Sequence, residues 1–176
     1  MRIRGATVAD IDAIAATHVE AWRATYPGLI PQPFLDAIRV DQRRDLWKEH
    51  LLDPKMGTLV VEDELGIAGF ASYGPAELPV EGSSPGEILG IYLLPRVIGM
   101  GVGRDLLARA TRGLTEDGYE RAVLWVLEAN TRACRFYEAA GWRWDGTVDQ
   151  QAFGEETRPV IRYTRELEPR RSASRS

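Results

Sequence analysis

Three glycines, Gly99, Gly101 and Gly103, occupy every second position after an apolar run that predicts a strand over 88–94. A helical pattern begins directly after them. Strand, glycine loop and helix N-terminus together form the layout of an anion site, because closely spaced backbone N–H groups and the positive end of the helix dipole point at one place. Glycines also let a phosphate approach the backbone, which a side chain would prevent. We therefore predict that a phosphate-carrying ligand binds at 99–104.

Several kinds of glycine loop hold phosphates, and the residues around the glycines separate them. A P-loop ends in Gly-Lys-Ser/Thr, whereas Gly103 is followed by Arg104 and Asp105, which excludes it. The dinucleotide fingerprint G-x-G-x-x-G would need a glycine at position 104 and a loop that follows the strand directly. Its acid after the next strand is present, at Glu128. An NAD-dependent oxidoreductase therefore remains an alternative, although a third type of loop fits better.

The third type is indicated by a second motif downstream. The chain reads N-x-x-A-x-x-F-Y-E-x-x-G-W from Asn130 to Trp142, and Glu87 stands at the start of the strand before the glycine loop. In this order the motifs resemble those of the GNAT superfamily of N-acetyltransferases, whose signature loop Q/R-x-x-G-x-G/A aligns on residues 98–103. The resemblance covers nearly the whole chain.

The resemblance implies a cosubstrate, acetyl-CoA, whose pyrophosphate is held by backbone N–H groups of the loop. It also implies that a backbone N–H of the strand polarises the thioester carbonyl, and that the motif asparagine binds the pantetheine arm, caps its helix, or does both. One position departs from the family: Ile98 replaces a Gln or Arg that helps hold the pyrophosphate. The residues assigned to acetyl-CoA are Ile91, Tyr92, Leu93, Gly99, Met100, Gly101, Val102, Gly103, Arg104 and Asn130.

Acetyl transfer from a thioester to an amine needs a base for the amine, an acid for the departing thiolate and alignment of the reactants. Tyr137 matches the tyrosine of the family's motif and is the candidate acid, since a Tyr with a pKa of about 10 can protonate a thiolate whose thiol titrates at about 8.5. Glu87 stands where many members keep a catalytic glutamate and is the candidate base, acting through water. The structural alternatives are a core tyrosine and a solvated acid at a strand end.

The acceptor is indicated by the first predicted helix. The segment 22–31 looks like members of the family that act on small amines, including polyamine acetylases, so Trp22 and Tyr26 are the candidate substrate-binding residues. Ordinary helix packing is the alternative. His18 lies on the same helix face and is interpreted as a core histidine. A branch that acetylates protein N-termini keeps a glutamate where this chain has Trp125, which favours a small-molecule amine here.

We therefore expect an acetyl-CoA-dependent N-acetyltransferase that moves an acetyl group to a primary amine of a small molecule by direct attack in a ternary complex. An acyl-enzyme on Cys134 is disfavoured, because no histidine lies in a recognisable relation to this cysteine. Two alternatives within the same fold are a non-catalytic acyl-CoA-binding sensor, suggested by Ile98, and a protein N-terminal acetyltransferase.

The elements that must position these residues predict an α/β fold with a mixed, mostly antiparallel seven-stranded sheet flanked by helices. The strands over 88–94 and 122–127 should be parallel, because a helix connects them. One domain over 1–167 is expected, followed by a disordered basic tail over 168–176. Strands are predicted over 3–6, 58–62, 67–73, 88–94, 122–127, 142–153 and 157–167, helices over 11–26, 31–53 in two pieces, 102–118 and 130–141, and an irregular loop over 74–86.

The composition limits the partners and the compartment. The net charge of −4 and the pI of about 5.3 argue against nucleic acid and mildly favour cationic substrates. One cysteine, no apolar signal core and no stretch long enough to span a membrane favour the cytoplasm. Two histidines and one cysteine in no ligand spacing argue against a metal. Trp142 and Trp144 suggest a homodimer through the C-terminal hairpin, and a core role for these residues is the alternative.

Overall fold

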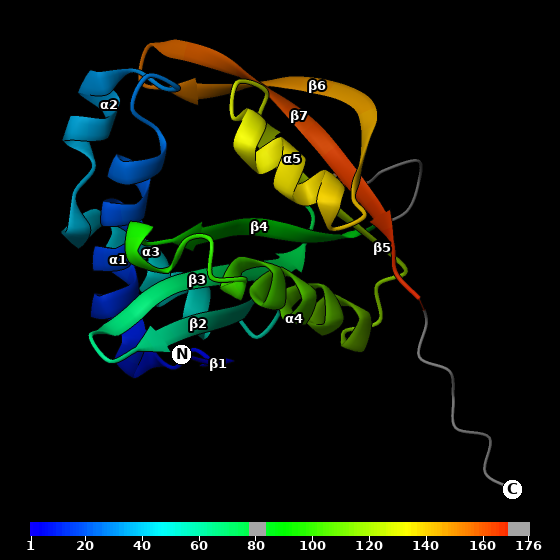
Figure 1. Cartoon of the computed structure of the whole chain (residues 1–176), viewed down its shortest axis with the longest axis horizontal. Helices are drawn as coiled ribbons and strands as arrows, with labels where there is room; N and C mark the ends of the chain where they lie inside the picture. The colour runs from blue at the N-terminus through cyan, green and yellow to red at the C-terminus, as the bar shows by residue number, and fades with distance from the viewer. Residues whose placement is uncertain (78–83, 169–176) are drawn as a thin grey trace, which may run out of the picture.

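A computed structural model describes residues 1–77 and 84–168 of the 176-residue chain (Figure 1). Helices and strands alternate along the sequence as the periodicity predicts. The strands are β1 (Arg2–Gly5), β2 (Gly57–Asp63), β3 (Gly66–Pro75), β4 (Gly86–Leu93), β5 (Arg121–Leu127), β6 (Arg143–Phe153) and β7 (Glu156–Glu166). The helices are η1 (Val8–Asp10), α1 (Ile11–Thr25), α2 (Gln32–Ala37), α3 (Val40–Leu52), η2 (Pro95–Val97), α4 (Val102–Glu116) and α5 (Thr131–Ala139), where η1 and η2 are single 3-10 turns.

The strands form one seven-stranded sheet in the order β1-β2-β3-β4-β5-β7-β6. Every neighbouring pair is antiparallel except β4 and β5, which are parallel and joined through α4. The predicted fold class and the predicted parallel pair are therefore confirmed. A mixed sheet of this kind also removes the dinucleotide alternative, which needs a doubly wound parallel sheet.

The two parallel strands diverge soon after they meet. The pairing of β4 with β5 consists of Gly86 with Ala122 and Glu87 with Val123. On its other edge β4 carries a β-bulge, since Tyr73 pairs with residue 88 while Ser72 pairs with residue 90. The strands then separate toward their carboxyl ends, as Figure 1 shows for β4 and β5. A gap in the middle of the sheet follows from this divergence.

The two faces of the sheet carry different helices. Leu124 and Val126 of β5 belong to the core built with α4 and α5. Trp125 and Leu127, which alternate with them, pack instead with residues of α1 and α2. A further cluster joins α1 and α3 to Phe70 of β3 and to Tyr92. Side chains at the gap therefore point either to the α4–α5 face or to the α1–α3 face.

Local signals in the sequence agree with the structure at several points. The backbone N–H and the hydroxyl of Thr7 both donate to Asp10 Oδ2, at 2.8 and 3.1 Å, just before the first helix begins. The predicted inward face of α4 is buried throughout: Val102, Leu106, Leu107, Ala110 and Leu114 are 6% exposed or less. The first observation defines where the first helix begins, and the second shows which face of α4 packs against the core.

Two sequence-based expectations need correction. The irregular loop predicted over 74–86 is shorter, because Gly74 and Pro75 extend β3 and pair with the first residues of β4. Trp142, considered as an interface residue, is a core residue with 1% exposure, whereas Trp144 is 54% exposed. Residues 78–83 and the tail beyond Glu168 lie outside the described residues, so the disordered tail remains a prediction, as does the single domain.

Two features are absent from residues 1–77 and 84–168. Among these residues no helix is both long and apolar enough to cross a membrane. Nor do three or more His, Cys, Asp or Glu side chains within the same ranges gather so that they could hold a metal ion. The homodimer remains a prediction.

Candidate active site

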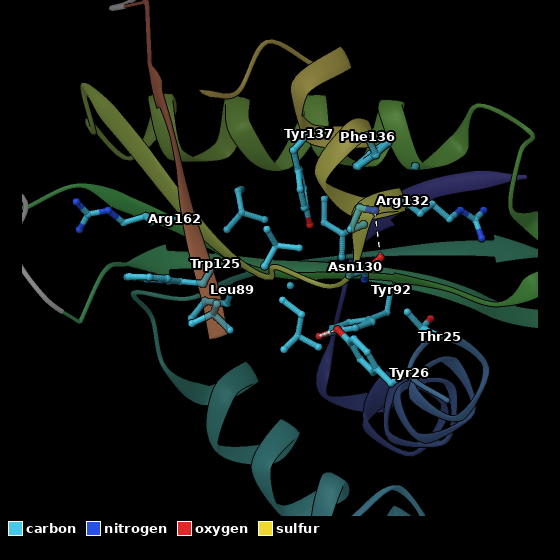
Figure 2. Close-up of a pocket in the computed structure, with 18 of the residues that line it drawn as sticks. Thr25, Tyr26, Leu89, Tyr92, Trp125, Asn130, Arg132, Phe136, Tyr137 and Arg162 are labelled. Atoms are coloured by element: carbon cyan, nitrogen blue, oxygen red, sulfur yellow. Dashed lines mark hydrogen bonds between the residues drawn. The ribbon is translucent and has the colours of Figure 1, made fainter. Parts of the chain in front are cut away.

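A cavity of about 980 Å³ occupies the gap between β4 and β5 (Figure 2). Its walls come from both diverging strands, the glycine loop, α5, α1 and the hairpin of β6 and β7. Twelve of the fourteen residues proposed for acetyl-CoA, catalysis or the acceptor line this cavity, namely Trp22, Tyr26, Glu87, Ile91, Tyr92, Leu93, Gly99, Gly101, Gly103, Arg104, Asn130 and Tyr137. Met100 and Val102 do not. The sequence therefore predicts most of one site whose members are far apart along the chain.

The three glycines of the loop do two different things. Gly99 and Gly101 have φ values of 85° and 83°, in the left-handed region that favours glycine, and a Cβ added to either would meet no atom within 4 Å. Gly103 is needed for close packing, because its Cβ would lie 3.1 Å from Leu93 Cδ1. The first two glycines thus shape an open loop beside the cavity, and the third lets α4 approach β4.

Met100 and Val102 alternate with these glycines and differ in exposure. Met100 is 61% exposed, while Val102 is 6% exposed and belongs to the core under α4. The Val102 side chain is therefore engaged in packing, which leaves only its backbone for a ligand. Ile98 lines the cavity with an apolar side chain at the position where the family motif has Gln or Arg.

Two helices begin at the cavity. Gly101 is the N-cap of α4, and Asn130 is the N-cap of α5, where its Oδ1 accepts a hydrogen bond from the Ala133 N–H at 3.2 Å. Both cap residues line the cavity. Because each helix N-terminus presents free N–H groups and a partial positive charge, this wall is suited to a ligand that carries phosphate.

Tyr137 extends from α5 on the α4–α5 face and is 8% exposed. Figure 2 shows its hydroxyl directed from the helix toward the strands. Burial raises the pKa of Tyr137 well above its ordinary value, and the nearby Tyr92 adds to that rise. The phenol therefore keeps its proton and can act as a donor in the cavity, while its ring belongs to the core. The core interpretation and the functional interpretation both fit the same residue.

Glu87 is the last residue of β4 that pairs with β5, and the two strands begin to separate after it. Burial raises the pKa of this carboxyl from 4.5 to about 7, and the carboxylate of Glu77 contributes to the rise. No side-chain hydrogen bond or ion pair of Glu87 is found within the described ranges. A carboxyl group that lines a cavity and titrates near neutral pH has the property that general base catalysis requires.

Trp22 and Tyr26 reach the cavity from α1. The hydroxyls of Tyr26 and Tyr92 lie 3.2 Å apart, and either can be the donor. The Trp22 ring meets the Tyr26 ring edge-on at 5.0 Å. This places the Tyr92 side chain on the α1–α3 face, whereas Tyr137 belongs to the cluster of the α4–α5 face. Any contact of residue 92 with acetyl-CoA on the opposite face would therefore have to use its backbone.

His18 belongs to the core rather than to the cavity wall. Its Nδ1 accepts a hydrogen bond from Trp47 Nε1 at 3.1 Å, so the proton of the neutral ring is on Nε2. Burial lowers the pKa of His18 from 6.5 to about 3, with a further contribution from the Arg43 charge. The expected core histidine is what the structure contains.

Cys134 lies on α5 outside the cavity wall. Burial raises the pKa of its thiol, and the neighbouring Glu138 carboxylate contributes to the rise. A thiol whose pKa is raised is a poor nucleophile at neutral pH. The structure gives no support to an acyl-enzyme on this residue.

Sequence reasoning missed part of the cavity wall. Leu89 of β4, Phe153 of β6, and Val160 and Arg162 of β7 all line the cavity. Trp125 lines it as well, although the sequence had indicated only that it replaces a glutamate. The alternation of side chains along β5 could have placed Trp125 on the opposite face from Leu124. The bulge in β4 and the position of the β6–β7 hairpin have no local signal in the sequence, so the other residues could not be predicted.

Comparison with known proteins assigns the class. The sequence model of the Acetyltransferase (GNAT) family matches residues 17–142. The chain is 38% identical over 138 residues to the uncharacterized N-acetyltransferase YuaI of Bacillus subtilis, with 78% of this chain and 77% of that protein covered. The chain belongs to the GNAT family of acetyltransferases.

More distant relatives carry more specific names. The chain is 25% identical over 150 residues to the spermidine N(1)-acetyltransferase of Thermoplasma acidophilum, with 84% of this chain and 91% of that protein covered. Two solved structures share the fold: the PaiA N-acetyltransferase of the same organism in complex with coenzyme A, with a TM-score of 0.75 and 18% identity, and yncA of Salmonella typhimurium with acetyl-CoA, with a TM-score of 0.73 and 22% identity. They cover 94% and 96% of this chain, and 98% and 94% of their own chains.

Proposed function

We propose that this acetyltransferase uses acetyl-CoA to acetylate the primary amine of a small molecule by direct attack in a ternary complex. The observation that carries the proposal is the cavity between β4 and β5, which has two helix N-termini on one side and Glu87 on the other. Relatives in solved structures are described with coenzyme A or acetyl-CoA bound, which supports the same cosubstrate here.

The glycine loop and the N-terminus of α4 hold the phosphates of acetyl-CoA in this proposal, and Asn130 binds the pantetheine arm, caps α5, or does both. Gly99 and Gly101 leave open space beside their backbone, and Gly101 and Asn130 begin the two helices. A backbone N–H of Ile91–Leu93 polarises the thioester carbonyl. These strand residues follow the point where β4 leaves β5, so the edge that faces the cavity is not used by the β4–β5 ladder.

The chemistry is divided between two side chains on opposite faces of the sheet. Glu87 accepts a proton from the ammonium group, directly or through water, and the free amine attacks the acetyl carbon. The C–S bond then breaks as the attacking nitrogen loses its second proton to solvent, and Tyr137 donates its proton to the departing thiolate and is reprotonated from solvent. The raised pKa of Glu87 supports the role of base, since this carboxyl titrates near neutral pH. The raised pKa of Tyr137 keeps the phenol protonated and available as a donor, although it makes the phenol a weaker acid than a free tyrosine.

A non-catalytic acyl-CoA sensor with the same fold is the second candidate, because Ile98 replaces a side chain that holds the pyrophosphate in the family. A thermal-shift panel with acetyl-CoA, CoA, NAD and NADP separates the ligands, since a ligand that binds only the native state raises the unfolding midpoint. Acetyl-CoA and CoA should stabilise the chain and the nicotinamide nucleotides should not. Binding without turnover over a broad amine panel would favour the sensor.

The glycine loop offers a sharper test with a matched control. Gly101→Val places a branched side chain at the open position beside the cavity and should weaken CoA binding by more than about tenfold, since one lost phosphate contact of 1.4 kcal/mol already gives that factor. Gly118→Val introduces the same backbone strain, since Gly118 has φ 92° and equally open surroundings but lies outside the cavity. If both variants bind CoA like the unchanged chain, the anion site is elsewhere. Ile98→Arg should tighten binding or leave it unchanged.

A further inference from the structure

The acceptor side of the cavity is set by the alternation of the two strands. Residue 88 packs toward α4 and α5, so Glu87 points to the α1–α3 face. Tyr92 packs on that face with Phe70, and Trp125 packs there with residues of α1 and α2. Figure 2 shows Trp125, Tyr92 and Tyr26 on one side of the strands and Tyr137 on the other. If the α4–α5 side takes acetyl-CoA, the amine enters from the α1–α3 side.

Most of the side chains on this acceptor side are apolar, although Thr25, Gln150 and Gln151 also line the cavity. Leu89 is 39% exposed although it sits inside the sheet, because it faces the cavity and not the packed core. Open apolar surface of this kind favours an apolar ligand, at about 25 cal/mol for each Å² removed from water. The apolar and aromatic residues that line the acceptor side are Trp22, Leu89, Trp125, Leu127, Phe153 and Val160.

Arg162 is the one cationic side chain on the acceptor side among the described cavity residues, and its charge is already paired with a carboxylate. Arg162 donates from Nε to Asp145 Oδ2 at 2.7 Å and from a terminal nitrogen to Thr147 Oγ1 at 2.9 Å. Its guanidinium also lies 5.6 Å from the centre of the Trp125 ring. Arg162 therefore positions the indole and offers little to a carboxylate of the substrate. The other two cations of the cavity wall, Arg104 and Arg132, come from α4 and α5.

The carboxylates on this side differ in depth. Glu87 is largely enclosed, whereas Glu77 and Asp149 are exposed at the rim of the cavity. Asp149 also accepts a hydrogen bond from the Gln150 N–H at 2.7 Å. Exposed carboxylates attract a cation weakly, because water screens them. The acceptor side thus has one deep position for an ammonium group, surrounded by apolar walls, with no uncompensated partner for a carboxylate among the described lining residues.

We infer that the acceptor is a primary monoamine on an uncharged apolar or aromatic body, and neither an amino acid nor a polyamine. This inference rests on the proposed function and narrows its acceptor. The ammonium group lies at Glu87, and the body of the molecule packs against Leu89 and the indole of Trp125. A carboxylate on the acceptor would meet no uncompensated cation on this side among the described lining residues, and a second ammonium group would meet only the exposed, water-screened carboxylates of Glu77 and Asp149.

Two matched pairs of acceptors test the inference. Phenethylamine and phenylalanine differ by one carboxylate, and hexylamine and 1,6-diaminohexane differ by a second ammonium group. With acetyl-CoA at saturation, kcat/KM should be at least about tenfold higher for the singly charged member of each pair, which corresponds to about 1.4 kcal/mol. A higher or equal value for phenylalanine or for the diamine would overturn the inference while the acetyltransferase proposal stands. Binding of acetyl-CoA with no turnover of any amine would overturn both.

A substitution of Leu89 tests the acceptor wall directly, because it needs only a change of preference between two amines and not the natural acceptor. Leu89→Asp adds a carboxylate to the apolar wall at a side chain that is already partly exposed, so the fold should tolerate it. The variant should shift the preference from hexylamine toward 1,6-diaminohexane. Leu65→Asp is the matched control, because Leu65 is 82% exposed at the β2–β3 turn outside the cavity. An unchanged preference in Leu89→Asp, or the same shift in Leu65→Asp, would contradict the assignment of Leu89 to the acceptor wall.

Discussion

Glu87 and His18 are two titratable groups on the same face of the sheet, the first partly buried and the second buried, and burial affects both in the same chemical sense. It favours the uncharged form, so it raises the pKa of Glu87 to about 7 and lowers the pKa of His18 to about 3. Their surroundings differ. His18 is enclosed by four aromatic rings, with centroids at 5.4 to 5.9 Å, and is hydrogen-bonded to Trp47. Glu87 faces the cavity.

The comparison shows that a shifted pKa does not by itself identify a functional residue. His18 has the larger displacement, yet its hydrogen bond and packing account for it as a core residue. Glu87 combines a smaller shift with access to a cavity and with the absence of a partner in the described part of the chain. Access to a reacting group is therefore the property that separates the two.

Among the substitutions that test this comparison, Glu87→Gln should have the largest effect on the rate of acetyl transfer. An alkylamine with a pKa of about 10.4 is only about 0.1% neutral at pH 7.4, so loss of the base should lower the rate by about 10²-fold near neutral pH. At about pH 9.5 the loss should shrink, because the free amine becomes abundant. Initial rates of acetyl transfer measure this, with His18→Gln as the control that should leave the pH profile in place. An equal loss at both pH values would make Glu87 structural.

Tyr137→Phe should give a smaller loss with a different signature. Removal of the phenol should lower kcat by about tenfold or more, since the donor interaction grows only as the thiolate forms. Acetyl-CoA binding, measured by calorimetry, should hardly change. Unlike the defect at Glu87, this one should persist at high pH, because hydroxide does not replace a proton donor. Recovery of the full rate at about pH 9.5 would remove Tyr137 as the acid.

The stability of the fold should respond to Glu87 in the opposite direction from activity. The folded chain binds the Glu87 proton more tightly than the unfolded chain, so the contribution of Glu87 to stability is greatest below about pH 4.5 and falls as the pH rises to about 7. Glu87→Gln removes this loss. Its melting temperature should exceed that of the unchanged chain by a few degrees at about pH 8, since 1 kcal/mol gives about 2–4 °C at this size. The difference should vanish at about pH 4.

His18 supplies the control for that measurement, because its sign is reversed. Its pKa is lower in the folded chain, so the stability that it allows is present above about pH 6.5 and is lost as the pH falls toward 3. His18→Gln should therefore be less stable at neutral pH, through the lost hydrogen bond, but should lose less on acidification. If the stability of Glu87→Gln and of His18→Gln depended on pH in the same way, the opposite pKa shifts assigned to Glu87 and His18 would be contradicted.

Glu77→Gln should give the smallest effect. The Glu77 carboxylate raises the pKa of Glu87, so its removal should shift the acid limb of the kcat/KM profile to lower pH. The plateau rate should not change, because Glu77 is exposed at the rim. Glu64→Gln, at the β2–β3 turn, is a matched control that should leave the limb in place. If the acid limb of the kcat/KM profile does not move in Glu77→Gln, burial alone accounts for the raised pKa of Glu87.

The sequence predicts the parts of the site that depend on local patterns. Gly99, Gly101 and the N-cap Asn130 are visible because a positive φ or a cap restricts the residue type. The residues contributed by the β6–β7 hairpin are not visible, since Val160 and Arg162 reach the cavity only through the strand order. Trp142 was considered for an interface because a tryptophan at a strand start has no local signal for burial. The raised pKa of Glu87 depends on burial that only the assembled fold provides.

The bulge at Leu89 has a consequence for how this chain can change over evolutionary time. A strand alternates with a period of two, so one inserted residue inverts the orientation of everything after it. This extra residue is the reason that Glu87 and Tyr92, which are an odd number of positions apart, share one face, while residues 88 and 91 share the other. Many substitutions within β4 should therefore be tolerated, whereas a deletion of a single residue there would exchange the contents of the two half-sites. In this segment the number of residues is under stronger constraint than their identity.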